Sequence, residues 1–95
     1  MTEIVKVGEN LFSALGFPAH EAEVLQWRAD LMARLRLWIN ESQLTQKEVA
    51  ERLGITQARV SDLVRGHWKK FSLDTLVALA LKAGMRVKIA IDQAA

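Results

Sequence analysis

The sequence contains no cysteine, and no stretch of it is rich in proline, glycine or serine. Without cysteine there is no disulfide, no thiolate nucleophile and no cysteine-ligated zinc site. The longest purely apolar run, residues 76–81, is far shorter than the roughly 20 residues of a membrane-spanning helix. The first residues also lack the basic leader and long apolar core of a secretion signal. We therefore expect a cytoplasmic protein with no membrane partner.

What the sequence does contain is typical of one folded domain. Its 95 residues are too few for two separate hydrophobic cores, and 51% of them are hydrophobic while 25% are charged. A chain of this size buries a limited share of its surface, so association with a second chain is a natural way to bury more. We expect a single domain that forms a homodimer.

Charge is distributed unevenly along the chain. The formal net charge is +2, but residues 1–58 carry −2 and residues 59–95 carry +4. Within residues 59–70 the basic groups are Arg59, Arg65, Lys69 and Lys70, and the acidic group is Asp62. A local basic stretch on a nearly neutral protein indicates a surface that faces a polyanion such as nucleic acid.

The first 20 residues are predicted to form an N-terminal segment with a short strand or one turn of helix. Residues 4–7 have the composition of a strand. Asn10 is a candidate N-cap for a turn over residues 11–15, which Gly16 would end.

A long helix is predicted from Pro18 to Glu41. Proline is favoured near a helix start because its missing N–H costs nothing there. Apolar residues cover roughly 200° of this helix, whereas a surface helix needs a stripe of about 100°. Two alternatives follow: the whole arc faces one core, or Trp27, Leu31 and Trp38 face another chain.

The next segment has the pattern of two short helices joined by a glycine turn. Thr45 and Glu48 have the spacing of a capping box, so a helix begins there. It ends at Gly54, and Thr56 is the N-cap of a second helix over residues 57–65. Such a pair of helices is a helix-turn-helix.

Two further elements complete the predicted fold. Ser72 caps a helix that Gly84 ends. Residues 86–92 alternate between apolar and polar, which predicts a β-strand paired with residues 4–7 or with the same strand of a second subunit. The predicted fold is therefore mostly α, with four to five helices and a short C-terminal β-strand. We expect three parts: the N-terminal segment 1–20, the helix-turn-helix domain 21–84 and a dimerisation strand within 85–95.

The polar face of the helix-turn-helix is the candidate functional site. The residues expected to face outward are Gln46, Thr56, Gln57, Ala58, Arg59, Ser61, Asp62 and Arg65. Amides, hydroxyls and guanidinium groups on the second helix suit the base edges in the major groove of double-stranded DNA. Lys69 and Lys70 follow this helix and are expected to contact phosphates.

Three other features have simpler explanations. Trp68 is expected to pack between the second helix and the helix after it, rather than to stack on a base. His20 and His67 lie far apart with no cysteine near them, so we expect no metal site. Ser61 and Asp62 are adjacent on a helix and therefore point apart, so we expect no catalytic site, no cofactor and no enzymatic activity.

One six-position pattern resembles the XRE (phage-repressor-like) family of helix-turn-helix regulators. The pattern is Q-x3-A-x3-G-I-x4-V-x2-L, formed by Gln46, Ala50, Gly54, Ile55, Val60 and Leu63. The resemblance covers about residues 21–84. It implies a DNA-binding domain in which the start and outer face of the second helix contact bases. The matching positions here are Gln57, Ala58, Arg59, Ser61 and Asp62.

A narrower resemblance includes the segments on either side. The chain is similar to HigA-type antitoxins, which are encoded beside RelE-like ribonuclease toxins, in the runs Asn10-Leu11-Phe12, Leu15-Gly16-Phe17 and Phe71-Ser72-Leu73 and in the terminal valine and isoleucine segment. This resemblance implies a homodimeric repressor of its own operon that also binds a RelE-like toxin. Because a dimer presents two copies of the second helix, we expect an inverted-repeat operator in double-stranded DNA.

We therefore interpret the sequence as that of a sequence-specific repressor and antitoxin, with two alternatives. The first is a stand-alone phage-type or operon regulator without a toxin partner. The second, from a different class, is a protein-interaction module in which the helix pair is only a scaffold. The basic stretch over residues 59–70 argues against the second alternative.

Overall fold

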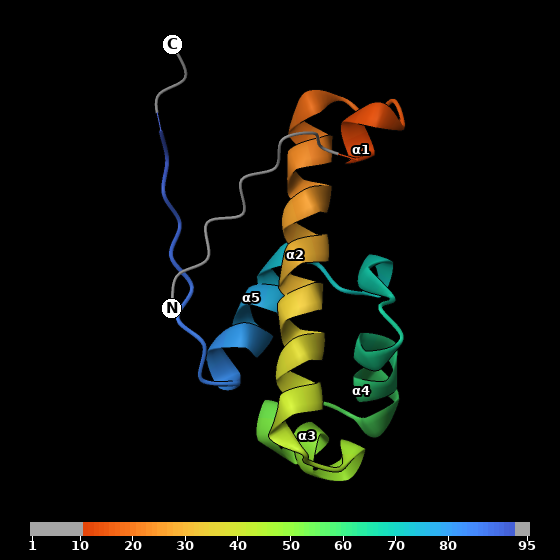
Figure 1. The fold of residues 1–95 in the computed structure, drawn as a ribbon, viewed down its shortest axis with the longest axis vertical. Helices are drawn as coiled ribbons and strands as arrows, with labels where there is room; N and C mark the ends of the chain where they lie inside the picture. Colours follow the sequence, from red (N-terminus) through yellow and green to blue (C-terminus); the bar gives the residue numbers. More distant parts are fainter. Residues whose placement is uncertain (1–10, 93–95) are drawn as a thin grey trace.

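The fold is organised around one long helix. A computed structural model describes residues 11–92, and Figure 1 shows the other helices arranged around α2. The elements are α1 (Leu11–Ala14), α2 (Ala19–Ser42), α3 (Gln46–Leu53), α4 (Gln57–Val64), the 3-10 turn η1 (Trp68–Lys70) and α5 (Leu73–Lys82). The predicted mostly α fold of four to five helices is confirmed for this part of the chain. None of the helices described is long and apolar enough to cross a lipid bilayer.

The ends of α2 follow from local side chains. Pro18 is the N-cap, with extended backbone at ψ 148°, and the helix begins one residue later. At the other end, Ser42 Oγ donates to the Ile39 carbonyl oxygen at 2.8 Å and accepts the Leu44 N–H at 3.2 Å. Gln43 takes a left-handed backbone conformation with φ 57°. This turn directs the chain from α2 into α3.

The core lies where the C-terminal half of α2 meets α3, α4 and α5. From α2 it contains Met32, Leu35 and Ile39, and between η1 and α5 it contains Phe71, a fully buried side chain. The remaining core residues are Val49, Ala50, Leu53, Val60, Leu63, Leu76, Leu79, Ala80 and Ala83. The apolar positions of the helix-turn-helix pattern therefore pack as predicted, with Ile55 half-buried at the turn.

The predicted capping box at the start of α3 is confirmed. Thr45 Oγ1 accepts the Glu48 N–H at 3.2 Å, and Glu48 Oε1 accepts the Thr45 N–H at 3.1 Å. These bonds, chiefly the one from the Thr45 backbone, hold the pKa of Glu48 below its usual 4.5. Because the pKa is lowered on folding, the charged cap stabilises the fold above pH 4.5, and this contribution is lost as the pH falls through the lowered value.

The other predicted caps are also present. Thr56 Oγ1 accepts the Arg59 N–H at the start of α4, and Ser72 Oγ accepts the Thr75 N–H at the start of α5, both at 3.2 Å. Between α3 and α4, Gly54 adopts a left-handed conformation with φ 67° and ends α3. The helix-turn-helix therefore has the boundaries that its caps and glycine predict, to within one residue.

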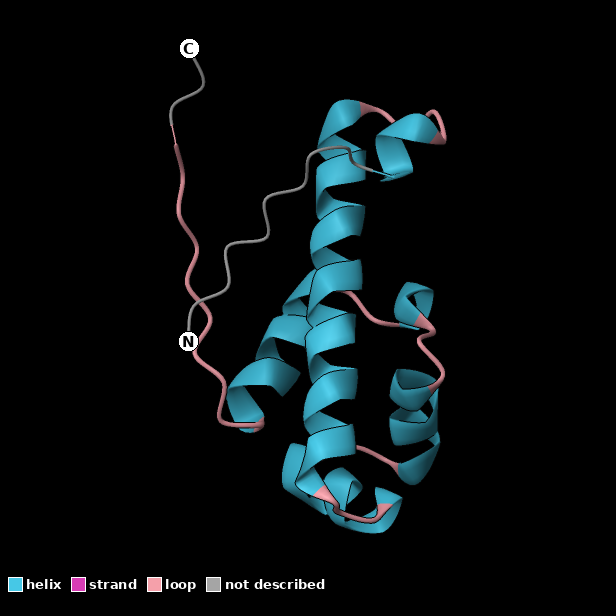
Figure 2. Cartoon of the chain, viewed as in Figure 1, coloured by secondary structure: helices cyan, strands magenta, loops and turns pink. Residues whose placement is uncertain are grey.

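The predicted C-terminal strand is wrong. No residue between 11 and 92 lies in a β-strand, and after Gly84 the chain continues as a loop (Figure 2). Ile89 and Ile91 on this segment are 83% and 93% exposed. Alternation of apolar and polar residues assigns faces, but a strand also needs a neighbouring chain for its backbone N–H and C=O groups. The helices described form most of their backbone hydrogen bonds within themselves and so offer no edge to which a strand could pair. The candidate partner, residues 4–7, lies outside the described residues.

The N-terminal end of α2 carries an apolar face that is only partly covered. The predicted helical turn is present as α1, which packs against α2, and Phe12 of α1 and Ala22 of α2 are both buried. We call the remaining exposed apolar residues the N-terminal apolar face. They are Leu15, Phe17, Val24 and Trp27, with exposed fractions from 38% to 65%.

The wide apolar arc of α2 therefore serves two purposes along its length. Leu31 and Trp38 pack against the core, whereas Trp27 is half exposed. Leu31 and Trp38 thus face the core of this chain and not a second chain, and a contact of Trp27 with another chain stays a prediction. The arc faces the core toward the C-terminal end of α2 and is left uncovered toward its N-terminal end.

Candidate nucleic-acid interface

The outer side of α4 presents polar side chains at its start. Gln57 and Ala58 are exposed in the first turn, while Val60 and Leu63 of the same helix are fully buried. Gln46 is likewise exposed in the first turn of α3, and Arg65, the C-cap of α4, is exposed at the other end. Burial of one side thus fixes which side of α4 is available to a ligand.

Two of the predicted outward residues are used within the fold. The Thr56 hydroxyl caps α4, as described above. The Arg59 guanidinium does not point away from the protein. It lies over the Phe71 ring, 4.0 Å from the centroid, and Nη1 donates to the Lys70 carbonyl oxygen at 3.0 Å. Arg59 therefore ties the start of α4 to the segment that follows η1.

Asp62 lies within a small charged cluster. Its Oδ1 is 3.2 Å from Lys70 Nζ and 3.3 Å from His67 Nδ1. The hydrogen bond from Lys70, and to a lesser degree that from His67, lowers the pKa of Asp62 below its usual 3.8. Ser61, one residue earlier, is half-buried. The negative charge of Asp62 is thus retained at any pH above its usual range and is shared by two basic neighbours.

A basic hollow follows the end of α4. Gly66, His67, Trp68, Lys69 and Lys70 line an open pocket on the surface. Lys69 and Lys70 are both exposed, and Lys69 Nζ lies 5.8 Å from the centroid of the Trp68 ring. The structure therefore brings the basic residues that follow the second helix together around one depression.

Trp68 packs differently from the prediction. Its ring meets Phe12 of α1 edge to face, with centroids 5.2 Å apart, and the Arg28 guanidinium of α2 lies 5.3 Å from its centroid. As a half-buried residue of η1, Trp68 lies against α1 and the N-terminal half of α2 in addition to packing against the core. The contacts with Phe12 and Arg28 join residues 40 or more positions apart and were not predicted.

Two arginines of α2 hold this whole region in place. Arg28 Nε donates to the Phe71 carbonyl oxygen at 2.9 Å, and its Nη2 donates to the carbonyl oxygens of Trp68 at 3.1 Å and Lys69 at 3.3 Å. Arg36 Nε donates to the carbonyl oxygen of Val64, the last residue of α4, at 3.1 Å. We call Arg28 and Arg36 the arginine clamp.

The arginine clamp is not among the features predicted from the sequence. Its members lie eight residues apart, which is about 12 Å along a helix, and so reach two successive groups of carbonyls. The feature of the sequence that points to the clamp is the position of these arginines beside the apolar arc of α2. An arginine placed there indicates contacts within the fold, since a charge that serves only for solvation would lie on the opposite face. Helix ends leave backbone carbonyls without partners, and a guanidinium donates in a fork that suits several of them at once.

Gly66 is the close neighbour of the clamp. Its backbone is left-handed, with φ 74°, and a Cβ placed on it would lie 3.2 Å from Arg36 Nη1. The backbone conformation just after α4 therefore favours glycine, and the arginine beside it leaves little room for a side chain.

Comparison with known proteins is consistent with this geometry. A family model described as a helix-turn-helix domain matches residues 14–92. The solved structure of a protein assigned to the XRE family of transcriptional regulators is similar, with a TM-score of 0.73 and 32% sequence identity over 78% of this chain and 83% of that one. The chain belongs to the XRE helix-turn-helix family.

This membership determines the general function. The protein is a DNA-binding transcriptional regulator, and because the family is a non-enzymatic DNA-binding one, it is not an enzyme. No curated protein matches the sequence significantly.

Replacing Arg28 tests the importance of the clamp. In Arg28→Met the aliphatic stem remains but three hydrogen bonds to carbonyl oxygens are lost, although the Trp68 oxygen keeps the Phe71 N–H, so the free energy of unfolding should fall by about 1–3 kcal/mol. Arg28→Lys should lie between this variant and the wild type, because an ammonium cannot donate as a planar fork. Urea denaturation followed by circular dichroism measures both. Arg86→Met, at an exposed arginine beyond α5, is the control, and an equal loss in that variant would show that the clamp has no special role.

Proposed function

We propose that the protein is a sequence-specific repressor that binds an inverted-repeat operator as a homodimer. The observation that supports this best is the combination of an exposed polar start of α4 with the basic hollow directly after the helix. The first provides groups that match base edges, and the second provides positive charge for the DNA backbone. A dimer presents two copies of α4, so the half-site centres should lie about 10 base pairs apart or at a multiple of that distance.

Within this proposal the residues of the interface have different roles. The Gln57 amide suits the paired donor and acceptor of adenine, and the Ala58 methyl suits the methyl group of thymine. Gln46 at the start of α3, together with Arg65 and Lys69, contacts phosphates. Arg59 positions α4 through Phe71 rather than reading a base, which departs from the role that its spacing predicts.

Replacing Gln57 and Lys69 distinguishes base recognition from non-specific electrostatic attraction to DNA. Gln57→Ala should cost about 1–3 kcal/mol on the operator and relax the preference at one base position, with little effect on a random duplex. Lys69→Ala should weaken both complexes and reduce the salt dependence by about one unit per subunit. The operator is first obtained by selection from a random-sequence library, and affinities are then measured at several salt concentrations. Equal losses on both duplexes for Gln57→Ala would show that α4 does not read sequence.

We propose that the homodimer buries the segment after α5. Ile89 and Ile91 are among the most exposed apolar side chains between residues 11 and 92, and they lie on a segment without helical structure. Exposed apolar side chains gathered in this way favour association. The double variant Ile89→Glu and Ile91→Glu should therefore shift the protein to the monomer in sedimentation equilibrium. Leu37→Glu, at an exposed apolar position of α2, should leave the dimer intact, and the opposite pattern would place the interface on α2.

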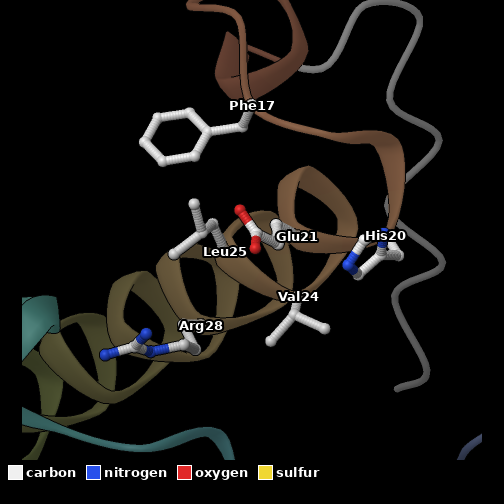
Figure 3. A pocket seen from close by; sticks show the side chains of 6 residues that line it. All are labelled: Phe17, His20, Glu21, Val24, Leu25 and Arg28. Carbon is white, nitrogen blue, oxygen red and sulfur yellow. The ribbon is translucent and has the colours of Figure 1, made fainter.

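We also propose that the protein is an antitoxin whose N-terminal apolar face binds a RelE-like toxin. Figure 3 shows Phe17 and Leu25 facing one another across an open pocket, with Arg28 at its far end. His20, Glu21 and Val24 complete the lining. The pocket lies at the end of α2 away from α3 (Figure 1), so a toxin there leaves α3 accessible. The support is the exposed apolar surface together with the resemblance to HigA-type antitoxins.

Co-expression with the product of the adjacent gene tests the antitoxin proposal. That product should arrest growth when expressed alone and should co-purify with the wild-type protein. Val24→Glu with Trp27→Glu should abolish co-purification and leave DNA binding intact, because both side chains are exposed and neither belongs to the core that positions α4. A neighbouring product that is neither toxic nor retained would favour the stand-alone regulator.

A further inference from the structure

We propose that Asp62 sets the specificity of DNA binding by withholding Lys70 from non-specific DNA. The inference rests on the proposed function, since it concerns the same interface. In it, Asp62 is a specificity-determining residue that contacts no base. The Asp62 carboxylate takes the place of a phosphate as the partner of Lys70. Lys70 leaves it only when a correctly placed phosphate of the DNA is available.

The geometry of the cluster supports this role. Lys70 Nζ and His67 Nδ1 both lie within 3.3 Å of the same carboxylate oxygen, Asp62 Oδ1. The side chain of Asp62 is 19% exposed, whereas those of His67 and Lys70 are 43% and 58% exposed. The carboxylate is therefore the inner partner, and the two basic groups lie around it toward solvent, where DNA would approach.

Because Asp62 lies on α4, its ion pair with Lys70 is at the surface proposed to face DNA and can change the affinity for DNA. Asp62 is the acidic residue within the basic stretch 59–70, so it cancels part of the charge at the surface that faces DNA. Lys70 also lines the basic hollow, and its backbone carbonyl is held by Arg59. The lysine backbone is thus fixed, while its ammonium has two alternative anionic partners, the carboxylate and a phosphate.

Competition between these partners distinguishes operator from random DNA. An exposed ion pair is weak, so a phosphate held in the right place can take over Lys70. On the operator, base contacts fix the register and bring a phosphate to that place. On a random duplex no register is fixed, Lys70 remains with Asp62, and the complex lacks one phosphate contact per subunit.

Asp62→Asn should therefore change the two complexes differently. Freed from its partner, Lys70 contacts phosphates of any duplex. The salt dependence of random-duplex binding should rise by about one unit per subunit, which is roughly a five-fold gain in affinity per subunit at about 0.15 M salt. The salt dependence on the selected operator should stay unchanged, so the ratio of operator to random affinity should fall. Glu23→Gln, which removes one exposed charge from α2, is the matched control and should alter neither slope.

Lys70→Ala provides an independent test that leaves Asp62 in place. In the wild-type background it should lower the salt slope on the operator by about one unit per subunit and leave the random-duplex slope unchanged. In the Asp62→Asn background it should lower both slopes. Thermal unfolding followed by circular dichroism confirms that each variant is folded.

Several results would overturn the proposal. One is an unchanged ratio of operator to random affinity in Asp62→Asn, and another is a gain on random duplex that persists without Lys70. Selective loss of operator binding in Asp62→Asn would show that the carboxylate reads a base. If the wild-type protein itself does not distinguish any selected sequence from random duplex, the proposed function is wrong. The inference about Asp62 is then wrong as well, because it depends on that function.

Discussion

Hydrogen bonds from two arginines of α2 to backbone carbonyls determine how the DNA-facing part of this protein is held. At the end of α4 the N–H groups of residues 65–67 bond to the carbonyls of residues 61–63, and Arg36 donates to the carbonyl of Val64, the last residue of the helix. Arg28 donates to the three carbonyls of Trp68, Lys69 and Phe71, at and just after η1. The helix that carries the clamp also contributes Met32, Leu35 and Ile39 to the core, so α4 and η1 are held in place relative to the core.

The interactions around Phe71 depend on this arrangement. Its carbonyl is bound by Arg28 and its ring is buried, with the Arg59 guanidinium lying over it. One residue therefore links α2, α4 and the chain leading into α5. Because Arg59 also holds the Lys70 carbonyl, the basic residues that meet phosphates share a rigid support with the helix proposed to read bases.

The sequence predicts those features that depend on neighbours close in the chain. Caps at Thr45, Thr56 and Ser72 and the turn at Gly54 follow from hydrogen bonds that span four residues or fewer. The apolar spacing also predicts which side of α4 is buried. It does not predict where a long side chain on the other side goes, and Arg59 folds back because the aromatic ring of Phe71, twelve residues later, lies within reach. The clamp, the partners of Trp68 and the missing strand all depend on distant parts of the chain, so local patterns could not supply them.

The glycine that follows α4 has a consequence for how this sequence can vary. Position 66 disfavours other residues mainly through its positive φ, which admits little besides asparagine or aspartate, the residues that best tolerate a left-handed backbone. The guanidinium of Arg36 would also have to move by a few tenths of an ångström to admit a Cβ there. Because the same guanidinium binds the Val64 carbonyl, a substitution at position 66 acts on a hydrogen bond made by a residue 30 positions earlier in the chain.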